Sequence, residues 1–368
     1  MKVAILGFGT VGQGVWEMID ASRDFETGPV LVLEREVSKP FHVTDIKCIT
    51  QDASVDSVVE CMGGINAAFE FTSACLKAGK NVVTSNKALV AAKGLELVKL
   101  ANENNCGFLF SAACGGAIPI LHNISIARQT DTIISCGGIM NGTTNFILSG
   151  IKSGKFDSYD QALSRAQQLG YAEADPTADV SGMDTLRKTM LLSAVSFDIL
   201  PESGLCREGI ENIDMYKGSG TVKLVGKCGK NGNGSVYAFV EPVICLPDSP
   251  LCGVSSNFNQ IMYTGKNSGI ISLYGQGAGR YPTASAVLRD LTGLKDGVKN
   301  MMLSNCTGGV ADNSQIINRY FVSVDGNEGI TEMSVQAMHE YAAEKRKSGC
   351  KVFFAQLEQE EQQEEQNA

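Results

Sequence analysis

Hydrophobic and polar positions in the first 110 residues alternate between two kinds of segment. Short apolar runs predict strands, and longer stretches with apolar residues at helical spacing separate these runs. The predicted strands are residues 3–6, 30–33, 47–50, 57–61, 81–84 and 107–110. The predicted helices are residues 10–22, 67–78 and 89–104. This order predicts a parallel, doubly wound α/β sheet with right-handed crossovers.

The pattern changes after residue 130, where strands and helices no longer alternate regularly. The predicted elements there are a strand at 132–140, helices at 159–168, 182–197 and 282–291, and strands at 221–227 and 235–244. Neighbouring apolar strands without a helix between them favour an antiparallel sheet. A second, α+β domain is therefore expected. The last residues, 357–368, are acidic and of low complexity, which is typical of a frayed helix or a disordered tail.

The sequence Gly-Phe-Gly-Thr-Val-Gly at residues 7–12 lies directly between the first predicted strand and the first predicted helix. Gly7 allows the tight turn, Gly9 lets the backbone approach a pyrophosphate, and Gly12 lets the helix and strand pack closely. The N–H groups at the helix N-terminus then face the phosphates. We expect dinucleotide binding. The alternative is a Rossmann-like fold that has lost its nucleotide.

The residues after the second predicted strand bear on the choice between NAD and NADP. Glu34 and Glu36 could hold a ribose 2′-hydroxyl, whereas Arg35 and Lys39 would favour a 2′-phosphate. NADP is slightly favoured, because two cations would converge on one phosphate. The alternative is a set of surface charges in a turn.

A charged turn precedes an apolar helix in the middle of the chain. Glu173, Asp175, Asp179 and Asp184 lie on the approach to this helix, and Lys188 follows Asp184 by one helical turn. Burying carboxylates and amines at the start of a helix costs folding free energy, so such groups are usually paired or used in function. The turn therefore predicts a catalytic cluster. A surface ion pair at an acidic helix start is the alternative.

Lys87 follows the predicted strand 81–84, after Ser85 and Asn86. Ligands of doubly wound sheets bind at the carboxyl ends of the strands. Lys87 is therefore expected to face the site and to bind a substrate carboxylate, a cofactor amide or a reacting oxygen. The alternative is a solvated surface lysine.

Composition excludes several classes of partner. Hydrophobic residues make up 43% of the 368-residue chain, and the net charge is −9 with no long basic run. Nucleic acid and anionic membrane partners are therefore not expected, and no apolar stretch approaches the ~18 residues of a spanning helix. Twelve cysteines without a C-x-x-C pair and no signal-peptide pattern predict reduced thiols in the cytoplasm. Three scattered histidines leave acid–base chemistry to lysine.

Several motifs together resemble those of homoserine dehydrogenase, from about residue 2 to residue 292. They are GFGTVG (7–12), TSNKALVA (84–91), GGAIPIL (115–121), GGIMNGTTNFIL (137–148), GYAEADPTADVSGMDTLRK (170–188), REGIENI (207–213) and GQGAGRYPTASAVLRDL (275–291). The NGTTNF sequence and the EADP…D…DxxxK spacing are highly specific. The glycine turn is not.

This resemblance implies a reversible, NAD(P)-linked interconversion of L-homoserine and L-aspartate 4-semialdehyde. It assigns Lys188 as general acid/base, Asp184 as the residue that orients the substrate, and Glu173 as the partner of the homoserine amino group. Lys87 matches a lysine at the junction of cofactor and substrate. The remaining residues that shape the substrate pocket by resemblance are Tyr171, Asp179, Thr143 and Gly142.

The resemblance also implies cofactor contacts and a structural sodium ion. The cofactor contacts are Gly7, Phe8, Gly9, Thr10, Val11, Gly12, Arg35, Lys39, Gly63, Ser85, Lys87 and Gly279. The sodium ligands would be the backbone carbonyls of Cys114, Gly116 and Ile118. Ser111 stands where the family often has a glutamate, and Cys114 where it often has a valine, which puts the sodium site in doubt.

The expected architecture is an NAD(P)-binding Rossmann domain followed by an α+β catalytic and dimerisation domain. The Rossmann domain spans 1–130 and is completed by 280–305, the second domain spans 131–279, and 306–368 form a short C-terminal appendage. Arg319–Val324 resembles the first strand of an ACT unit, so the appendage is interpreted as an abbreviated ACT unit and threonine feedback is a hypothesis. A homodimer is expected. Two alternatives stay open: a dehydrogenase of another small amino or hydroxy acid, and a non-catalytic nucleotide sensor.

Overall fold

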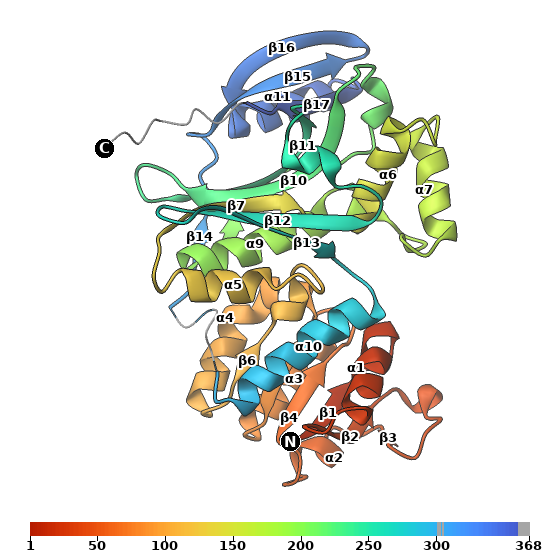
Figure 1. The fold of residues 1–368 in the computed structure, drawn as a ribbon, viewed down its shortest axis with the longest axis vertical. Helices are drawn as coiled ribbons and strands as arrows, with labels where there is room; N and C mark the ends of the chain where they lie inside the picture. Colours follow the sequence, from red (N-terminus) through yellow and green to blue (C-terminus); the bar gives the residue numbers. More distant parts are fainter. Residues whose placement is uncertain (300–302, 304, 360–368) are drawn as a thin grey trace. The chain divides into compact units, whose positions relative to one another are not determined.

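The computed structural model describes residues 1–299, 303 and 305–359 of the chain (Figure 1). The described chain divides into two compact units, each built from three stretches of sequence. The first unit comprises Met1–Cys136, Arg187–Ser203 and Ile261–Val310. The second comprises Gly137–Leu186, Gly204–Gln260 and Ala311–Ala368.

The first unit contains the predicted doubly wound sheet. Its six strands are parallel and follow the order β3-β2-β1-β4-β5-β6. The strands are β1 (Lys2–Leu6), β2 (Glu26–Leu31), β3 (His42–Val43), β4 (Ser57–Glu60), β5 (Asn81–Thr84) and β6 (Phe108–Leu109). The helices that accompany them are α1 (Thr10–Asp20), α2 (Lys47–Thr50), α3 (Asn66–Lys77), α4 (Lys87–Glu103) and α10 (Arg280–Lys295). This arrangement confirms the predicted Rossmann-like fold.

The register of the central strands brings their carboxyl ends to one edge of the sheet. Leu6 of β1 pairs with Glu60 of β4, and Glu60 pairs with Thr84 of β5. The loops that follow these strands therefore begin side by side. Apolar side chains from β1, β4, β5, α1 and α10 pack into one buried core.

One element of this unit was predicted wrongly. Residues 47–50 form the short helix α2 instead of a strand, and the strand at this edge of the sheet is β3. The carboxylate of Asp45 accepts a hydrogen bond from the backbone N–H of Lys47 at 2.9 Å, which favours a helical start. A short apolar run does not distinguish strand from helix by periodicity alone, which explains the error.

The predicted strand 30–33 is also displaced. Strand β2 begins at Glu26, runs through Gly28 and Pro29, and ends at Leu31. A Cβ at Gly28 would lie 2.9 Å from the carbonyl oxygen of Val3, so the close approach of β1 requires glycine there. Glycine and proline obscured this strand in the sequence.

Further strands and helices lie in the first unit or where the chain passes from one unit to the other. The strands β13 (Gly269–Gln276), β12 (Phe258–Gly265) and β7 (Ile133–Ile139) are consecutive neighbours in one sheet. Strand β8 (Ile199–Ser203) pairs in parallel with β14 (Thr307–Val310). The helices are α5 (Ile120–Ala127) and α9 (Met183–Phe197). Short 3-10 turns are η1 (Glu34–Glu36) and η2 (Ser111–Ala113) in the first unit, and η3 (Ile213–Met215) and η4 (Pro250–Gly253) in the second.

The second unit is built on a sheet with both pairing directions. Strand β10 (Thr221–Lys230) is antiparallel to β11 (Val236–Cys245), whereas β17 (Val352–Leu357) and β9 (Cys206–Arg207) are parallel to β11. Strand β15 (Ile317–Val324) is antiparallel to both β17 and β16 (Asn327–Ser334). The helices are α6 (Gly142–Lys152), α7 (Tyr159–Gln168), α8 (Thr177–Val180) and α11 (Val335–Lys347).

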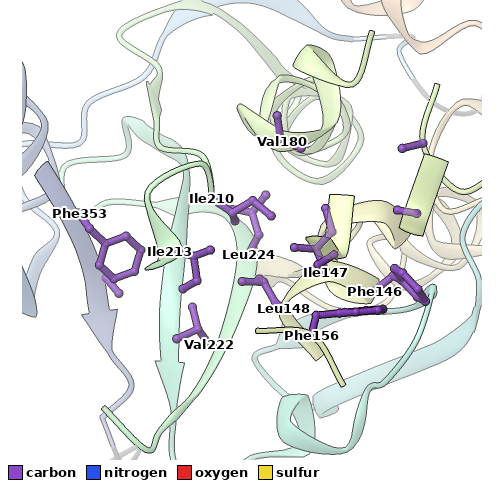
Figure 2. Close-up of a cluster of buried hydrophobic side chains, with 14 of the residues drawn as sticks. Phe146, Ile147, Leu148, Phe156, Val180, Ile210, Ile213, Val222, Leu224 and Phe353 are labelled. Atoms are coloured by element: carbon purple, nitrogen blue, oxygen red, sulfur yellow. The ribbon is translucent and has the colours of Figure 1, made fainter. Parts of the chain in front are cut away.

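Helix α6 is anchored in the buried core of the second unit (Figure 2). Phe146, Ile147 and Leu148 of α6 are buried together with Val222 and Leu224 of β10. The residues directly before them, Asn141–Asn145, are thereby held in place at the start of the helix. The core thus fixes the segment that carries the most specific motif of the sequence.

The C-terminal segment does not form a sheet of its own. After β14 its described part has the order β15-β16-α11-β17, and β17 pairs with β11 of the same sheet. This order is shorter than the β-α-β-β-α-β order of a complete ACT unit, and the interpretation of the described residues 305–359 as an abbreviated ACT unit stays a prediction. The predicted tail at 360–368 lies outside the described residues. Among the described helices, none combines the length and apolar character needed to cross a membrane.

Candidate active site

The glycine turn between β1 and α1 has the geometry that its three glycines predict. Gly7 has φ +91°, and its N–H donates to the carbonyl oxygen of Leu31 at 3.0 Å. A Cβ at Gly12 would lie 2.2 Å from the carbonyl oxygen of Gly7, whereas a Cβ at Gly9 would meet no described atom within 4 Å. Gly9 is the N-cap of α1. The turn therefore leaves space for an anion at the helix N-terminus.

The charged residues after β2 are all on the surface. Arg35 lies in the short turn η1, Lys39 follows it, and both side chains are exposed. A carboxylate oxygen of Glu36 is 3.4 Å from the backbone N–H of Leu33, from which it accepts a hydrogen bond. Glu36 is therefore partly engaged by its own turn, while Arg35 and Lys39 are exposed in the segment that follows β2.

The loops after β4 and β5 are joined by hydrogen bonds. Asn86 is the N-cap of α4, and its amide donates to the carbonyl oxygens of Met62 at 3.3 Å and Gly64 at 2.7 Å. Gly63 lies between these two carbonyls, and Lys87 is the first residue of α4. The predicted cofactor residues Gly63, Ser85 and Lys87 are thus brought to the same edge of the sheet.

A pair of carboxylates in the second unit shares one asparagine. The side-chain amide of Asn141 donates to Asp179 at 2.7 Å and to Asp184 at 3.0 Å. The carbonyl oxygen of the same side chain accepts the backbone N–H of Thr144 at 2.8 Å and so caps α6. The two predicted carboxylates are therefore held together by a residue that the sequence analysis did not select. The sequence feature that could have identified Asn141 is its position as an N-cap asparagine at the start of the NGTTNF motif.

Three other predicted pocket residues surround this pair. The hydroxyl of Thr143 is 2.5 Å from the carbonyl oxygen of Tyr171 and 3.3 Å from Asp179. The ring of Tyr171 contacts Phe146, with centroids 5.1 Å apart. A Cβ at Gly142 would lie 2.7 Å from the carbonyl oxygen of Asn257, so only glycine fits there. The motif at 141–146 thus carries both the polar contacts and the packing.

Helix α9 presents two of its charged residues, Asp184 and Lys188, in a buried setting. Asp184 lies in its first turn and Lys188 follows one turn later. Their exposed fractions are 5% and 7%, so the alternative of a surface ion pair does not hold. Glu173, by contrast, is exposed in the segment between α7 and α8. Asp179 and Asp184 therefore meet at Asn141, whereas Glu173 remains accessible to solvent.

The segment 111–118, which contains the predicted sodium ligands Cys114, Gly116 and Ile118, is held by protein groups. The backbone N–H of Ser111 donates to Asp290 at 2.8 Å, and its hydroxyl also donates to this carboxylate. Burial raises the pKa of Asp290 to about 6. The Arg289 guanidinium donates to the carbonyl oxygen of Ala117 at 3.1 Å, and the carbonyl of Ile118 accepts the N–H of Ile120 at 2.9 Å. Gly279, at φ +124°, is the N-cap of α10, the helix that carries Arg289 and Asp290.

No metal-binding cluster accompanies these sites. Within residues 1–299, 303 and 305–359, no group of three or more His, Cys, Asp or Glu side chains is arranged to hold a metal ion. All twelve cysteines lie in this part of the chain, and no disulfide joins them.

Comparison with known proteins gives one family throughout. The family model described as homoserine dehydrogenase matches residues 119–292, and that described as homoserine dehydrogenase, NAD binding domain, matches residues 7–111. The homoserine dehydrogenase of Corynebacterium glutamicum is 40% identical over 317 residues, which cover 79% of this chain and 71% of that protein. That of Bacillus subtilis is 36% identical over 342 residues, covering 87% and 77%.

Solved structures agree with the sequence comparison. A homoserine dehydrogenase from Thiobacillus denitrificans superposes with a TM-score of 0.84 at 26% identity, covering 97% of this chain and 98% of that one. A hyperthermophilic archaeal homoserine dehydrogenase in complex with NADPH gives a TM-score of 0.72 at 26% identity, covering 82% and 99%.

Proposed function

Because this chain belongs to the homoserine dehydrogenase family, it is an NAD(P)-dependent oxidoreductase that interconverts L-homoserine and L-aspartate 4-semialdehyde, and we propose the following roles for its residues. These roles rest on the hydrogen bonds from Asn141 to both Asp179 and Asp184. Asp184 lies in the first turn of α9, the helix that also bears Lys188. The alternative substrates and the sensor role are not favoured by the family matches.

Lys188 is the general acid/base of the reaction. When the aldehyde is reduced, its carbonyl oxygen becomes an alkoxide that needs a proton, and the Lys188 ammonium donates one from Nζ. In the reverse direction the neutral amine accepts the hydroxyl proton of homoserine. A nicotinamide cofactor, when bound, would supply or accept the hydride. Burial of Lys188 strengthens its electrostatic interactions with a developing alkoxide.

The carboxylates orient the substrate. Asp184, held by Asn141, orients the reacting end beside Lys188, and Asp179 stabilises the same arrangement. We assign the exposed Glu173 to the α-ammonium group of the substrate, because a charged hydrogen bond to a carboxylate suits that cation. Tyr171, Thr143 and Gly142 shape the pocket around it. Lys87 binds a substrate carboxylate or a cofactor amide.

The residues around the glycine turn fit a dinucleotide. The open space at Gly9 and the N-terminus of α1 at Thr10 suit a pyrophosphate, so Gly7–Gly12 would hold the phosphates with backbone N–H groups. Gly63, Ser85, Lys87 and Gly279 are assigned to the rest of the cofactor. We infer that NADP is preferred over NAD, because Arg35 and Lys39 are exposed in the segment that follows β2.

Replacing Arg35 with alanine is expected to weaken NADPH binding about tenfold, since one charge-assisted hydrogen bond is worth about 1.5 kcal/mol or more. The Kd of NADH should change by less than about twofold, because NADH lacks the 2′-phosphate. Fluorescence titration with each nucleotide measures both constants. Lys99→Ala, which removes an exposed cation of α4, serves as the control and should leave both Kd values unchanged. Equal weakening of NADH and NADPH binding by Arg35→Ala would contradict the 2′-phosphate assignment.

The segment 111–118 does not fit a structural sodium ion. The Arg289 guanidinium is bound to the carbonyl of Ala117, between the proposed ligands Gly116 and Ile118, and would repel a cation there. Ser111 supplies no carboxylate and is engaged by Asp290. No step of the reaction is therefore assigned to sodium. Exchanging Na⁺ for choline at constant ionic strength should leave kcat and Tm unchanged, and a fall in Tm on removing Na⁺ would show that the ion is bound.

The domain division and the assembly are also proposals. We propose a dinucleotide domain of 1–130 completed by 280–305, a catalytic and dimerisation domain of 131–279, and a C-terminal segment from 306. The two compact units differ from this division, because residues 187–203 and 261–279 group with the first unit. A homodimer and a cytoplasmic location are proposed. Light scattering during size-exclusion chromatography tests the dimer.

A further inference from the structure

Glu60 is a buried carboxylate at the cofactor edge of the sheet that the proposed chemistry does not use. It is the last residue of β4, and its exposed fraction is 0%. One carboxylate oxygen accepts the backbone N–H of Met62 at 2.7 Å, and the other accepts the hydroxyl of Thr84. Burying a charged group is costly unless it is hydrogen-bonded and used. The position therefore calls for a functional explanation.

The contacts of Glu60 continue into the two neighbouring loops. The hydroxyl oxygen of Thr84 accepts the backbone N–H of Asn86 at 2.9 Å. Asn86 in turn caps α4 by accepting the N–H of Leu89 at 3.0 Å, and its amide donates to Met62 and Gly64. The carboxylate, the hydroxyl and the amide thus form one closed network. It ties the loop after β4 to the start of α4.

Lys87 is the residue directly after this network. Its backbone follows Asn86, so the direction in which its side chain leaves α4 depends on the N-cap geometry. Gly63 lies in the loop at the other end of the network. A change in the Glu60 contacts would therefore shift two groups that are assigned to cofactor and substrate.

We propose that Glu60 is a positioning residue of the reaction, which fixes the loop 61–64 and Lys87 relative to each other through Thr84 and Asn86. This inference rests on the proposed role of Lys87 and Gly63 at the cofactor. Glu60 itself touches no substrate. Its effect is on the alignment of groups at the carboxyl ends of β4 and β5, and misalignment of about 1 Å can lower a rate about 100-fold.

The ionisation state of Glu60 decides which groups in this network donate hydrogen bonds and which accept them. The ionised carboxylate accepts a hydrogen bond from the Thr84 hydroxyl. A lone pair of the Thr84 hydroxyl oxygen is then available to the N–H of Asn86. A protonated Glu60 would donate towards Thr84 and deprive the Thr84 hydroxyl of its acceptor. Burial raises the pKa of Glu60 to about 7, against the opposing effect of hydrogen bonds from Thr84, Met62 and Asn86. The network is therefore complete above about pH 7 and weakens below it.

One titratable neighbour of Glu60 has its pKa shifted further above this range. Cys61 follows Glu60 in the chain, and burial together with the charge of Glu60 raises the pKa of that thiol. Lys87 begins the helix packed beyond Thr84. Asp290, a second buried carboxylate of this unit, has its pKa raised by burial to about 6, so the part of an acid limb that Glu60→Gln removes is the part that reports on Glu60.

The experiment compares kcat for L-aspartate 4-semialdehyde reduction between pH 5.5 and 9 in the wild type and in Glu60→Gln. The wild-type kcat should fall as pH drops below about 7. Glu60→Gln should lower kcat at pH 8 by about 10- to 100-fold and abolish this acid limb. The KM of the cofactor should change less than kcat. A Glu60→Gln enzyme with wild-type kcat and an unchanged acid limb would overturn the proposal.

Thermal stability separates positioning from a structural role. The pKa of Glu60 is raised in the folded protein, so its ionisation costs folding free energy as pH rises from about 4.5 to about 7. Glu60→Gln removes that cost, and its Tm at pH 8 should therefore be no lower than that of the wild type. A loss of kcat that simply follows a loss of Tm would overturn the positioning role.

Further variants make the test specific. Thr84→Val removes the hydroxyl and should reproduce the Glu60→Gln phenotype, and the double variant should lose little more activity than either single one. Glu241→Gln is the matched control, because Glu241 is an equally buried carboxylate on β11, bound by Tyr320 and His339. It should keep the acid limb. If Lys87→Ala retains wild-type kcat, the assigned role of Lys87 fails, whereas loss of the acid limb in Glu60→Gln would still show that Glu60 acts through the loop 61–64.

Discussion

Replacing Lys188 with alanine is expected to lower kcat in both directions by about 10²- to 10⁴-fold, the contribution that a positioned general acid or base makes. The side chain is 7% exposed on α9, one turn beyond Asp184, so water cannot readily take its place as proton donor. The Kd of NADPH should stay within about twofold, because the phosphate contacts are made at the glycine turn. Stopped-flow and steady-state assays at 340 nm measure the rate, and fluorescence titration measures the Kd.

Two controls distinguish lost chemistry from lost structure. Lys188→Met keeps an unbranched side chain of similar volume. It should show the same loss of kcat with a Tm close to that of the wild type. Lys80→Met removes another buried lysine, which donates to the carbonyl oxygens of Asp52 and Val55 near the amino end of β5. It should lower Tm but leave kcat unchanged. A Lys188→Ala enzyme within tenfold of the wild-type rate would show that another group transfers the proton.

The second large effect is expected from Gly12→Ala. Its Cβ would lie 2.2 Å from the carbonyl oxygen and 3.1 Å from the carbonyl carbon of Gly7, and both are backbone atoms that cannot rotate away. Such overpacking should cost about 3 kcal/mol or more and displace α1 from β1. The Tm of the dinucleotide domain should fall, and NADPH binding should be lost. Differential scanning calorimetry and fluorescence titration measure the two effects.

Gly9→Ala provides the contrast within the same turn. A Cβ at Gly9 would meet no described atom within 4 Å, so the fold should accept it and Tm should stay near the wild-type value. The added methyl group would occupy the space assigned to the pyrophosphate, and the Kd of NADPH should rise at least about tenfold. Normal NADPH binding by Gly9→Ala would show that the phosphates do not lie against Gly9.

Local sequence patterns determined much of the first unit. Strand β5 has the predicted bounds, α7 in the second unit does as well, and α1 begins at the predicted Thr10. These elements depend on periodicity and on cap or turn residues, which act within one or two turns of the chain. The prediction of a strand at 47–50 failed for the same reason, because four residues, of which only Cys48 and Ile49 are apolar, are too few to define a period.

The chemistry of the site was readable from the sequence only in part. The spacing of Asp184 and Lys188 placed both on one helix, but only the structure showed that both are buried. Burial decides between a solvated ion pair and a catalytic pair, and it depends on elements distant in the chain. The resemblance of the motifs to homoserine dehydrogenase supplied the reaction, which the family matches confirm.

Contacts between distant residues were decided by the tertiary structure alone. Asn141 meets Asp179 and Asp184 across 38 and 43 residues, and Glu60 meets Thr84 across 24. No local pattern encodes such pairs, since they form only when packed helices and paired strands bring separate segments together. By itself the sequence determined which elements form and which residues can carry the chemistry, because propensity and periodicity are local. The tertiary structure determined which of those residues share a hydrogen bond, because burial and pairing are properties of the whole fold.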